Sequence, residues 1–309
     1  MKVTLISTVK DCADRVPAFL ASLAAQTRAP DEVVIVDGGS SDDTAARFRG
    51  DPAITLIEAP GANISAGRNT ALAHATHEVI AATDADCELD PGWLAAIVAP
   101  IEEGADVTAG FYVPVVEGFF QTCMAAVNLP LDAAEVDPAR FMPSARSVAF
   151  RREAMDAVGG YPEWLDIGED MWVNHRWREL GMDVRFAPDA VVQWTLRPDL
   201  VSTWRQYFRY GRGDALAGMN PERHALRYGV CGGAVAALSS ERRWPKVLVG
   251  VGAVAYASGP VRRAWRRFPD PAGRAAALAA VPALMAFIDT AKMAGYAAGL
   301  LRRLRGPQP

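Results

Sequence analysis

Short apolar runs rich in β-branched residues alternate with amphipathic stretches through the first 113 residues, and this alternation most constrains the fold. It is typical of βαβ units, in which parallel strands form a sheet and the connecting helices cover its faces. The apolar runs predict strands at Val3–Val9, Glu32–Asp37, Ile54–Glu58, Val79–Asp84 and Val107–Tyr112. The stretches between them predict helices at Asp14–Gln26, Asp42–Phe48, Ser65–Ala75 and Pro91–Glu102. We therefore expect an α/β fold with a mostly parallel central sheet.

The pattern changes in the second half of the chain. Residues Phe119–Pro143 read as an irregular segment, and order resumes at Ser147–Phe150, Arg151–Val158 and Glu169–Leu180. Beyond Asp199 the chain is predicted to be helical, first in an aromatic and basic stretch and then in two apolar segments, Val247–Ser258 and Ala275–Leu301.

The composition of the chain limits the classes of partner that we expect it to bind. A net charge of -4 and a pI near 5.7 do not favour non-specific nucleic-acid binding, which needs a basic surface. Four cysteines without metal spacing, and a first segment too polar for a signal peptide, predict a cytoplasmic location. Arginine pairs collect in the C-terminal third, whereas residues 31–106 are acidic, so we expect different partners for the two parts.

The two apolar segments are short of membrane-spanning length. Their uncharged runs contain about 12 and 14 residues, whereas a spanning helix needs about 20. Extending the second run to Leu301 brings Asp289 and Lys292 into it, at a cost of a few kcal/mol each. We expect a helical hairpin in or against the cytoplasmic leaflet, where flanking arginines attract anionic lipid. An alanine-rich helical cap on the catalytic domain or on a dimer partner is the alternative.

The first acidic motif is Val33–Thr44, VVIVDGGSSDDT, in which a buried-type strand ends on Asp37 and continues through two glycines. An aspartate at this position can accept hydrogen bonds from a base or ribose, and the glycines let a ligand approach the backbone. A plain strand–turn–helix, with Ser41 or Asp42 as the N-cap, explains the same residues.

The second motif is Val79–Cys87, VIAATDADC, where an apolar strand again ends in acids. In an extended segment the side chains of Asp84 and Asp86 point to the same side and can face one cation. Carboxylate oxygens favour Mg²⁺ or Mn²⁺, and a bound diphosphate would complete the coordination shell. Solvated loop acids are the alternative reading.

The third motif is Asp166–Gly181, DIGEDMWVNHRWRELG, which starts a predicted helix with the adjacent acids Glu169 and Asp170. Acids at a helix N-terminus are favoured electrostatically, so helix capping alone can explain them. A metal–diphosphate site also needs a carboxylate on the other side of the anomeric carbon, which deprotonates the attacking hydroxyl.

The motifs DGGSSDDT, ISAGRNTAL, DADC and GEDMWVNHRWRELG, in this order and spacing, resemble family 2 glycosyltransferases of the GT-A fold. The resemblance covers roughly residues 1–215. It implies that Asp37 binds the base or ribose, Asp84 the nucleotide sugar and Asp86 the metal. Asp170, beside Glu169, is the implied base of a reaction that inverts the anomeric centre.

Two further sequence elements resemble those of the same family. Arg68 and Asn69, in the AGRN stretch, are the implied nucleotide or phosphate contacts, with a helix-surface arginine as the alternative. The run Gln206–Tyr210 resembles the QxxRW element, with Tyr210 in place of tryptophan, so Gln206 and Arg209 are implied donor-site residues. The tryptophan-to-tyrosine change weakens the case for a chain-extending synthase. The tail is similar to that of succinoglycan-type exopolysaccharide enzymes, which use lipid-linked acceptors.

We therefore expect a catalytic domain over residues 1–218, with a nucleotide-sugar half at 1–113 and an acceptor half at 114–218. Residues 219–309 form the expected helical, apolar and basic extension at the inner face of the membrane. The implied donor is a UDP-sugar, with GDP and dTDP open, the cofactor is Mn²⁺ or Mg²⁺, and the acceptor is a glycan or a lipid-linked glycan.

Two other functions compete with this reading. A sugar-1-phosphate nucleotidyltransferase would need a glycine-rich basic phosphate loop near the N-terminus, and Val9–Cys12 has no such composition. A catalytically silent, membrane-associated scaffold that binds sugar nucleotides would be indicated by loss of the acids, but Asp37, Asp84, Asp86 and Asp170 are all present.

Overall fold

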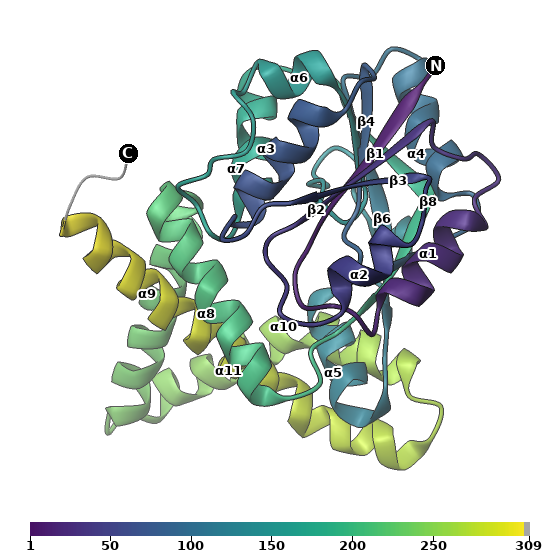
Figure 1. The fold of residues 1–309 in the computed structure, drawn as a ribbon. Helices are drawn as coiled ribbons and strands as arrows, with labels where there is room; N and C mark the ends of the chain where they lie inside the picture. The colour runs from purple at the N-terminus through teal and green to yellow at the C-terminus, as the bar shows by residue number, and fades with distance from the viewer. Residues whose placement is uncertain (306–309) are drawn as a thin grey trace. The chain divides into compact units, whose positions relative to one another are not determined.

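The computed structural model describes residues 1–305, which divide into two compact units (Figure 1). The sheet unit comprises Met1–Val115 and Asp132–Thr195, and the helical unit comprises Val116–Leu131 and the chain from Leu196 onward. Every strand in the described part of the chain belongs to the sheet unit.

The sheet has eight strands in the order β3-β2-β1-β4-β7-β6-β8-β5 across residues 1–305. Strands β1 to β4 pair in parallel, β6 pairs with β8 in parallel, and β7 runs antiparallel to both β4 and β6. Strand β5 is antiparallel to β8. The strands are β1 Val3–Val9, β2 Glu32–Asp37, β3 Ile54–Glu58, β4 Val79–Ala82, β5 Cys87–Leu89, β6 Val107–Val115, β7 Val148–Arg151 and β8 Val184–Thr195.

Helices cover both faces of the sheet. Helices α3, α6 and α7 lie on one side, and α1 and α4 lie on the other (Figure 1). On the first side Ile6, Ile80 and Phe150 of the strands pack with Ala71 of α3 and Trp177 of α7 in one buried apolar cluster. The helices are α1 Val16–Ala24, α2 Thr44–Arg49, α3 Ile64–His74, α4 Trp93–Glu102, α6 Arg152–Asp156 and α7 Glu169–Glu179.

The predicted elements of the first 113 residues are confirmed. Three strands have the expected bounds, and each of the four helices overlaps its predicted range. The expected strand Val79–Asp84 ends at Ala82, so the acids that follow it lie in a turn. The mostly parallel sheet is confirmed, with the antiparallel β7 inserted between β4 and β6.

The expectation of an irregular segment over Phe119–Pro143 is wrong in its first part. Helix α5, Gly118–Asn128, occupies it and buries Cys123, Met124 and Ala125. No side chain caps its N-terminus, so the sequence carried no start signal for it. Tertiary packing of its apolar residues determines this helix.

The helical unit contains α5, α8 Leu200–Ala217, α9 Pro221–Ser239, α10 Arg243–Arg267 and α11 Pro271–Leu304. Both apolar segments of the C-terminal region are helical as expected, within α10 and α11. Among the helices of residues 1–305, α11 alone is both long enough and apolar enough to cross a membrane, by length and composition only. That is weak evidence, because core helices pass the same test.

Helices α8 and α11 pack closely through glycines. A Cβ atom at Gly295 of α11 would lie 1.9 Å from the Phe208 carbonyl oxygen, and one at Gly211 of α8 would lie 2.1 Å from the Lys292 carbonyl oxygen. The two backbones therefore approach too closely for any side chain at these positions. Helix α8 belongs to the helical unit, whereas the sequence analysis assigned it to the catalytic domain. The predicted boundary at residue 218 between a catalytic domain and an extension stays a prediction.

Candidate active site

Acidic side chains from separate motifs gather at one edge of the sheet unit. Asp37 is the last residue of β2, and Asp84 follows the end of β4 by two residues. Both strands pair in parallel with β1, so their carboxyl ends lie at the same edge. This is the edge at which open α/β sheets bind ligands.

Arg68 connects two of the motifs. From helix α3 its Nη1 donates to Glu169 Oε1 at 2.5 Å, and its Nη2 donates to Asp84 Oδ1 at 3.0 Å. The guanidinium also lies over the Tyr161 ring, 5.3 Å from its centroid. Only 3% of Arg68 is exposed, which excludes the alternative of a helix-surface arginine.

Glu169 is buried beside this arginine at the start of α7. Burial raises the pKa of Glu169, and the Arg68 charge acts in the opposite direction. Its second carboxylate oxygen, Oε2, has no hydrogen-bond partner among residues 1–305. The contacts of Glu169 are therefore those of a residue that positions Arg68, and its predicted catalytic role stays a prediction.

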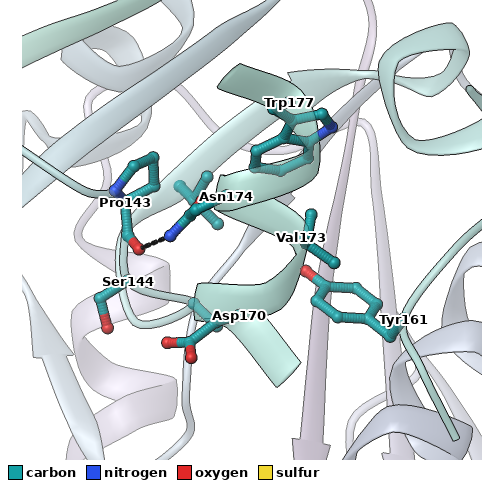
Figure 2. Close-up of a pocket in the computed structure, with 9 residues that line it drawn as sticks. Pro143, Ser144, Tyr161, Asp170, Val173, Asn174 and Trp177 are labelled. Atoms are coloured by element: carbon teal, nitrogen blue, oxygen red, sulfur yellow. Dashed lines mark hydrogen bonds between the residues drawn. The ribbon is translucent and has the colours of Figure 1, made fainter. Parts of the chain in front are cut away.

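Asp170 is more accessible than its neighbour. Its Oδ1 accepts a hydrogen bond from the Met171 amide at 2.8 Å, and the residue lies in the first turn of α7. Figure 2 shows its carboxylate beside Ser144, at a pocket that Tyr161 and Asn174 also line. The pocket has a volume of about 10 Å³, enough for one water molecule.

Asp84 and Asp86 have different environments. The expectation that they project from an extended segment is wrong, because the Cys87 amide donates to the Asp84 carbonyl at 3.0 Å and closes a turn. Asp84 is half-buried, with Oδ1 bonded to Arg68 and Oδ2 3.8 Å from Arg146 Nε. Asp86 is exposed.

These residues fit a divalent metal only in part. Within the described residues no group of three His, Cys, Asp or Glu side chains could hold a metal ion. Asp86, with hard oxygen donors and an exposed side chain, fits as one ligand of Mg²⁺ or Mn²⁺. Both carboxylate oxygens of Asp84 face arginines. Oxygen atoms of the bound nucleotide sugar would therefore have to supply most of the metal's coordination shell.

Two predicted donor-site residues have structural contacts. Asp37 is 3% exposed, and its Oδ1 accepts hydrogen bonds from the Ser40 amide at 3.0 Å and hydroxyl at 2.7 Å. The Asn69 amide group bonds the Tyr161 backbone on both sides, through its Nδ2 at 2.9 Å and its Oδ1 at 2.8 Å, and contacts Glu163. Asp37 thus shapes the turn after β2, and Asn69 holds the loop before α7. Their donor contacts stay predictions.

The remaining predicted residues belong to the helical unit. Gln206 and Arg209 lie on α8, where Gln206 Nε2 donates to the Tyr210 hydroxyl at 2.8 Å and Arg209 is exposed. The tyrosine that replaces the tryptophan of the QxxRW element therefore pairs with the glutamine of the same element. The predicted donor roles of Gln206 and Arg209 stay predictions.

Arg146 is a residue of this site that the sequence analysis missed. Its guanidinium lies 4.1 Å from the Trp194 ring centroid and 5.7 Å from that of Tyr112, with Nε 3.8 Å from Asp84 Oδ2. Its Nη1 donates to Ser144 Oγ at 3.1 Å. A single arginine in a segment without a motif gave no signal, because its partners are distant in sequence.

Solved structures share the fold. A mannosyltransferase from Pyrobaculum calidifontis, solved with GDP-Man and Mn²⁺, matches with a TM-score of 0.55 and 19% identity, over 100% of this chain and 88% of that one. Staphylococcus aureus TarS 1-349 in complex with UDP matches with a TM-score of 0.51 and 17% identity, over 99% and 91%. The fold is GT-A, as the resemblance implied.

Sequence comparison identifies the family. The pre-mycofactocin glycosyltransferase of Mycobacterium tuberculosis is 28% identical over 267 residues, which are 81% of this chain and 53% of that protein. The chain thus spans about half the length of this relative. The model of the family described as Glycosyl transferase family 2 matches residues 4–159, half of the chain. The chain belongs to glycosyl transferase family 2.

Proposed function

We propose that this glycosyltransferase is inverting and metal-dependent, and that it moves a sugar from a nucleotide-diphosphate donor to a hydroxyl of a glycan or lipid-linked acceptor. The reaction would serve cell-envelope or exopolysaccharide synthesis at the inner face of the membrane. The observation that carries the proposal is the bridge from Arg68 to Asp84 and Glu169, which joins the donor-side motif to the start of α7. Asp170 follows Glu169 in the chain, is half-buried and lines the small pocket beside Ser144.

In the proposed step, the acceptor oxygen attacks the anomeric carbon as the bond from that carbon to the diphosphate breaks. Asp170, in the first turn of α7, takes the proton of the attacking hydroxyl as the general base. Because the acceptor oxygen attacks on the side opposite the departing diphosphate, the configuration of the anomeric centre is inverted.

Cationic groups stabilise the departing diphosphate in this mechanism. A divalent cation, held by Asp86 with Asp84 nearby, would supply charge neutralisation when bound. Arg146 contributes a fixed positive charge that the Trp194 ring and Asp84 hold in place. Because this charge is positioned before the donor arrives, it costs little reorganisation during the reaction.

We propose a UDP-sugar as the donor, with GDP-sugars and dTDP-sugars as the other candidates. The TarS structure contains UDP, and the Pyrobaculum mannosyltransferase structure contains GDP-Man and Mn²⁺. These ligands belong to those two proteins, and they support nucleoside diphosphates with a divalent metal as the class to test.

Calorimetric titration of UDP, GDP and dTDP, each with and without Mn²⁺, tests the donor site. Wild type is compared with Asp86→Ala and with Glu88→Ala, a matched control at an exposed acid two residues away. We expect one nucleotide to bind in a metal-dependent manner to wild type and to the control, but not to Asp86→Ala. Absence of binding by all three nucleotides in folded protein would overturn the proposal.

A further inference from the structure

Helices α9 and α10 have almost no protein core. All of their residues are described, yet α9 buries one side chain, His224, and α10 buries two, Ala257 and Ala264. Helix α11 of the same unit buries nine. A helix of a soluble domain normally buries a continuous apolar stripe, so these two helices lack the covering that their composition requires.

The exposed side chains of this hairpin are large and apolar. On α10, residues at helical spacing form a stripe whose members are each 60% to 72% exposed: Trp244, Val247, Leu248, Val251 and Val254. On α9 the exposed apolar residues point in several directions around the helix: Leu226, Val230, Val235 and Leu238. A contiguous apolar surface of this kind marks an interaction site.

The base of the hairpin is fixed by one carboxylate of α11. Asp289 Oδ1 accepts from Arg227 of α9 at 3.0 Å, and its Oδ2 accepts from the Tyr256 hydroxyl of α10 at 2.7 Å. At the far end of α10, Arg263 donates to the Ala126 carbonyl of α5. The segment between these anchors, residues 229–255, carries most of the exposed apolar side chains.

Basic residues flank the apolar surface. Arg242, Arg243 and Lys246 are exposed at the turn between the two helices, and Arg262 is exposed at the other end of the apolar part of α10. The apolar runs of α9 and α10 contain roughly 13 to 15 residues, fewer than the 20 or so of a spanning helix. Apolar surface of this length with cationic ends is complementary to the interface of an anionic bilayer.

A lipid surface fits these observations better than a folded partner. A protein that docks on a helix covers one face, whereas α9 exposes apolar side chains in several directions and so suits an apolar medium. The long apolar helix α11 is covered by protein along one side, where it buries nine residues and its Gly295 packs directly on the α8 backbone. The expected membrane hairpin of Val247–Ser258 with Ala275–Leu301 stays a prediction, and the exposed side chains favour a different pair of helices, α9 and α10.

We propose that the α9–α10 hairpin, residues 229–255, inserts into the interfacial layer of an anionic lipid bilayer and carries the membrane association of the chain. This inference rests on the proposed membrane association and assigns that association to the α9–α10 hairpin. It is independent of which nucleotide sugar the chain binds. The bilayer is recognised through apolar insertion of the hairpin and through attraction of Arg242, Arg243 and Lys246 to anionic headgroups.

Flotation of the full chain with vesicles tests the proposal. Phosphatidylcholine vesicles are compared with mixed phosphatidylcholine–phosphatidylglycerol vesicles, and we expect binding to the mixed vesicles that high salt weakens. The variant Val247→Glu/Val251→Glu/Val254→Glu should lose flotation, because its positions are exposed and its charges oppose insertion. The control Leu278→Glu/Leu300→Glu/Leu301→Glu places the same three charges at exposed positions of α11 and should float as wild type does.

The arginines provide a second variant that leaves the apolar surface intact. Arg242→Glu/Arg243→Glu should lower the partition coefficient on mixed vesicles by roughly tenfold or more, since each basic residue near the surface contributes about 1 kcal/mol. On phosphatidylcholine vesicles this variant and wild type should behave alike. Equal binding of the variant and wild type to mixed vesicles would remove the electrostatic part of the proposal.

Insertion itself can be followed at Cys231, which is exposed on α9, whereas Cys87 and Cys123 are buried. In a Cys12→Ser background, an environment-sensitive fluorophore on Cys231 should shift its emission to shorter wavelength on mixed vesicles. Loss of flotation in the α11 control with retention in the hairpin variant would overturn the assignment. So would a soluble dimer that the hairpin variant dissociates, with no vesicle binding by wild type.

Nucleotide titration of the same variants separates this inference from the donor site. Hairpin variants that lose vesicle binding should retain the nucleotide affinity of wild type. A chain that binds vesicles through the hairpin but binds no nucleotide would leave the inference standing and overturn the proposed donor chemistry.

Discussion

Arg68 and Glu169 are 101 residues apart in the sequence and form a buried ion pair, with Nη1 and Oε1 2.5 Å apart. The pair fixes the start of α7 against α3, and the second arm of the arginine extends the connection to Asp84. The donor-side motif and the start of α7 are therefore connected through one guanidinium group.

The pH dependence of stability reports on Glu169. Burial raises its pKa in the folded protein, so in the pH range between its unfolded and folded pKa values the folded state binds more protons than the unfolded state. The free energy of unfolding should therefore fall as pH rises through that range. Denaturant titrations at a series of pH values should show this slope in wild type and its loss in Glu169→Gln. An identical slope in the two proteins would contradict the assignment.

Asp170→Asn should lower turnover by about 10² to 10⁴, because the amide cannot accept the proton of the acceptor hydroxyl. Nucleotide affinity and melting temperature should stay near those of wild type, since the Asp170 carboxylate accepts its hydrogen bond from the neighbouring Met171 amide. Glu179→Gln, at the exposed end of the same helix, is the control and should retain full turnover. Unchanged turnover in Asp170→Asn would remove this residue from the mechanism.

Arg146→Ala should weaken binding of the nucleoside diphosphate by about tenfold or more and leave binding of the monophosphate nearly unchanged. The reason is that a charge-assisted hydrogen bond to the terminal phosphate contributes roughly 1.5 to 3 kcal/mol. Calorimetry with UDP and UMP measures the difference. Arg176→Ala is the matched control, because Arg176 lies over Trp172 on the exposed part of α7. Equal losses for UDP and UMP would indicate a structural role.

Gly295→Ala should lower the free energy of unfolding by roughly 1 to 3 kcal/mol, because the added methyl group would meet the Phe208 carbonyl of α8. Gly250→Ala on α10 is the control, since nothing lies within 4 Å of its added Cβ. That change should be neutral or stabilising by up to about 1 kcal/mol, as alanine favours helix. Denaturant unfolding measures both, and equal effects would show that α8 and α11 do not pack as described.

The sequence by itself determined the first half of the fold and the motifs. Strands such as Glu32–Asp37 could be predicted because side-chain periodicity is a property of neighbouring residues. The placement of Asp37 and Asp84 at one sheet edge followed from the parallel pairing that such strands require. The order and spacing of the motifs along the chain also indicated the family, which the comparisons confirm.

Only the tertiary structure decided what the motif residues contact. The pairing of Arg68 with Glu169, the stacking of Arg146 on Trp194 and the helix at Gly118–Asn128 all depend on residues distant in sequence. The separation of a packed α11 from an uncovered α9–α10 hairpin depends likewise on which glycines meet the α8 backbone. Composition cannot distinguish these helices, because burial is a property of the whole fold and hydropathy is a property of the segment.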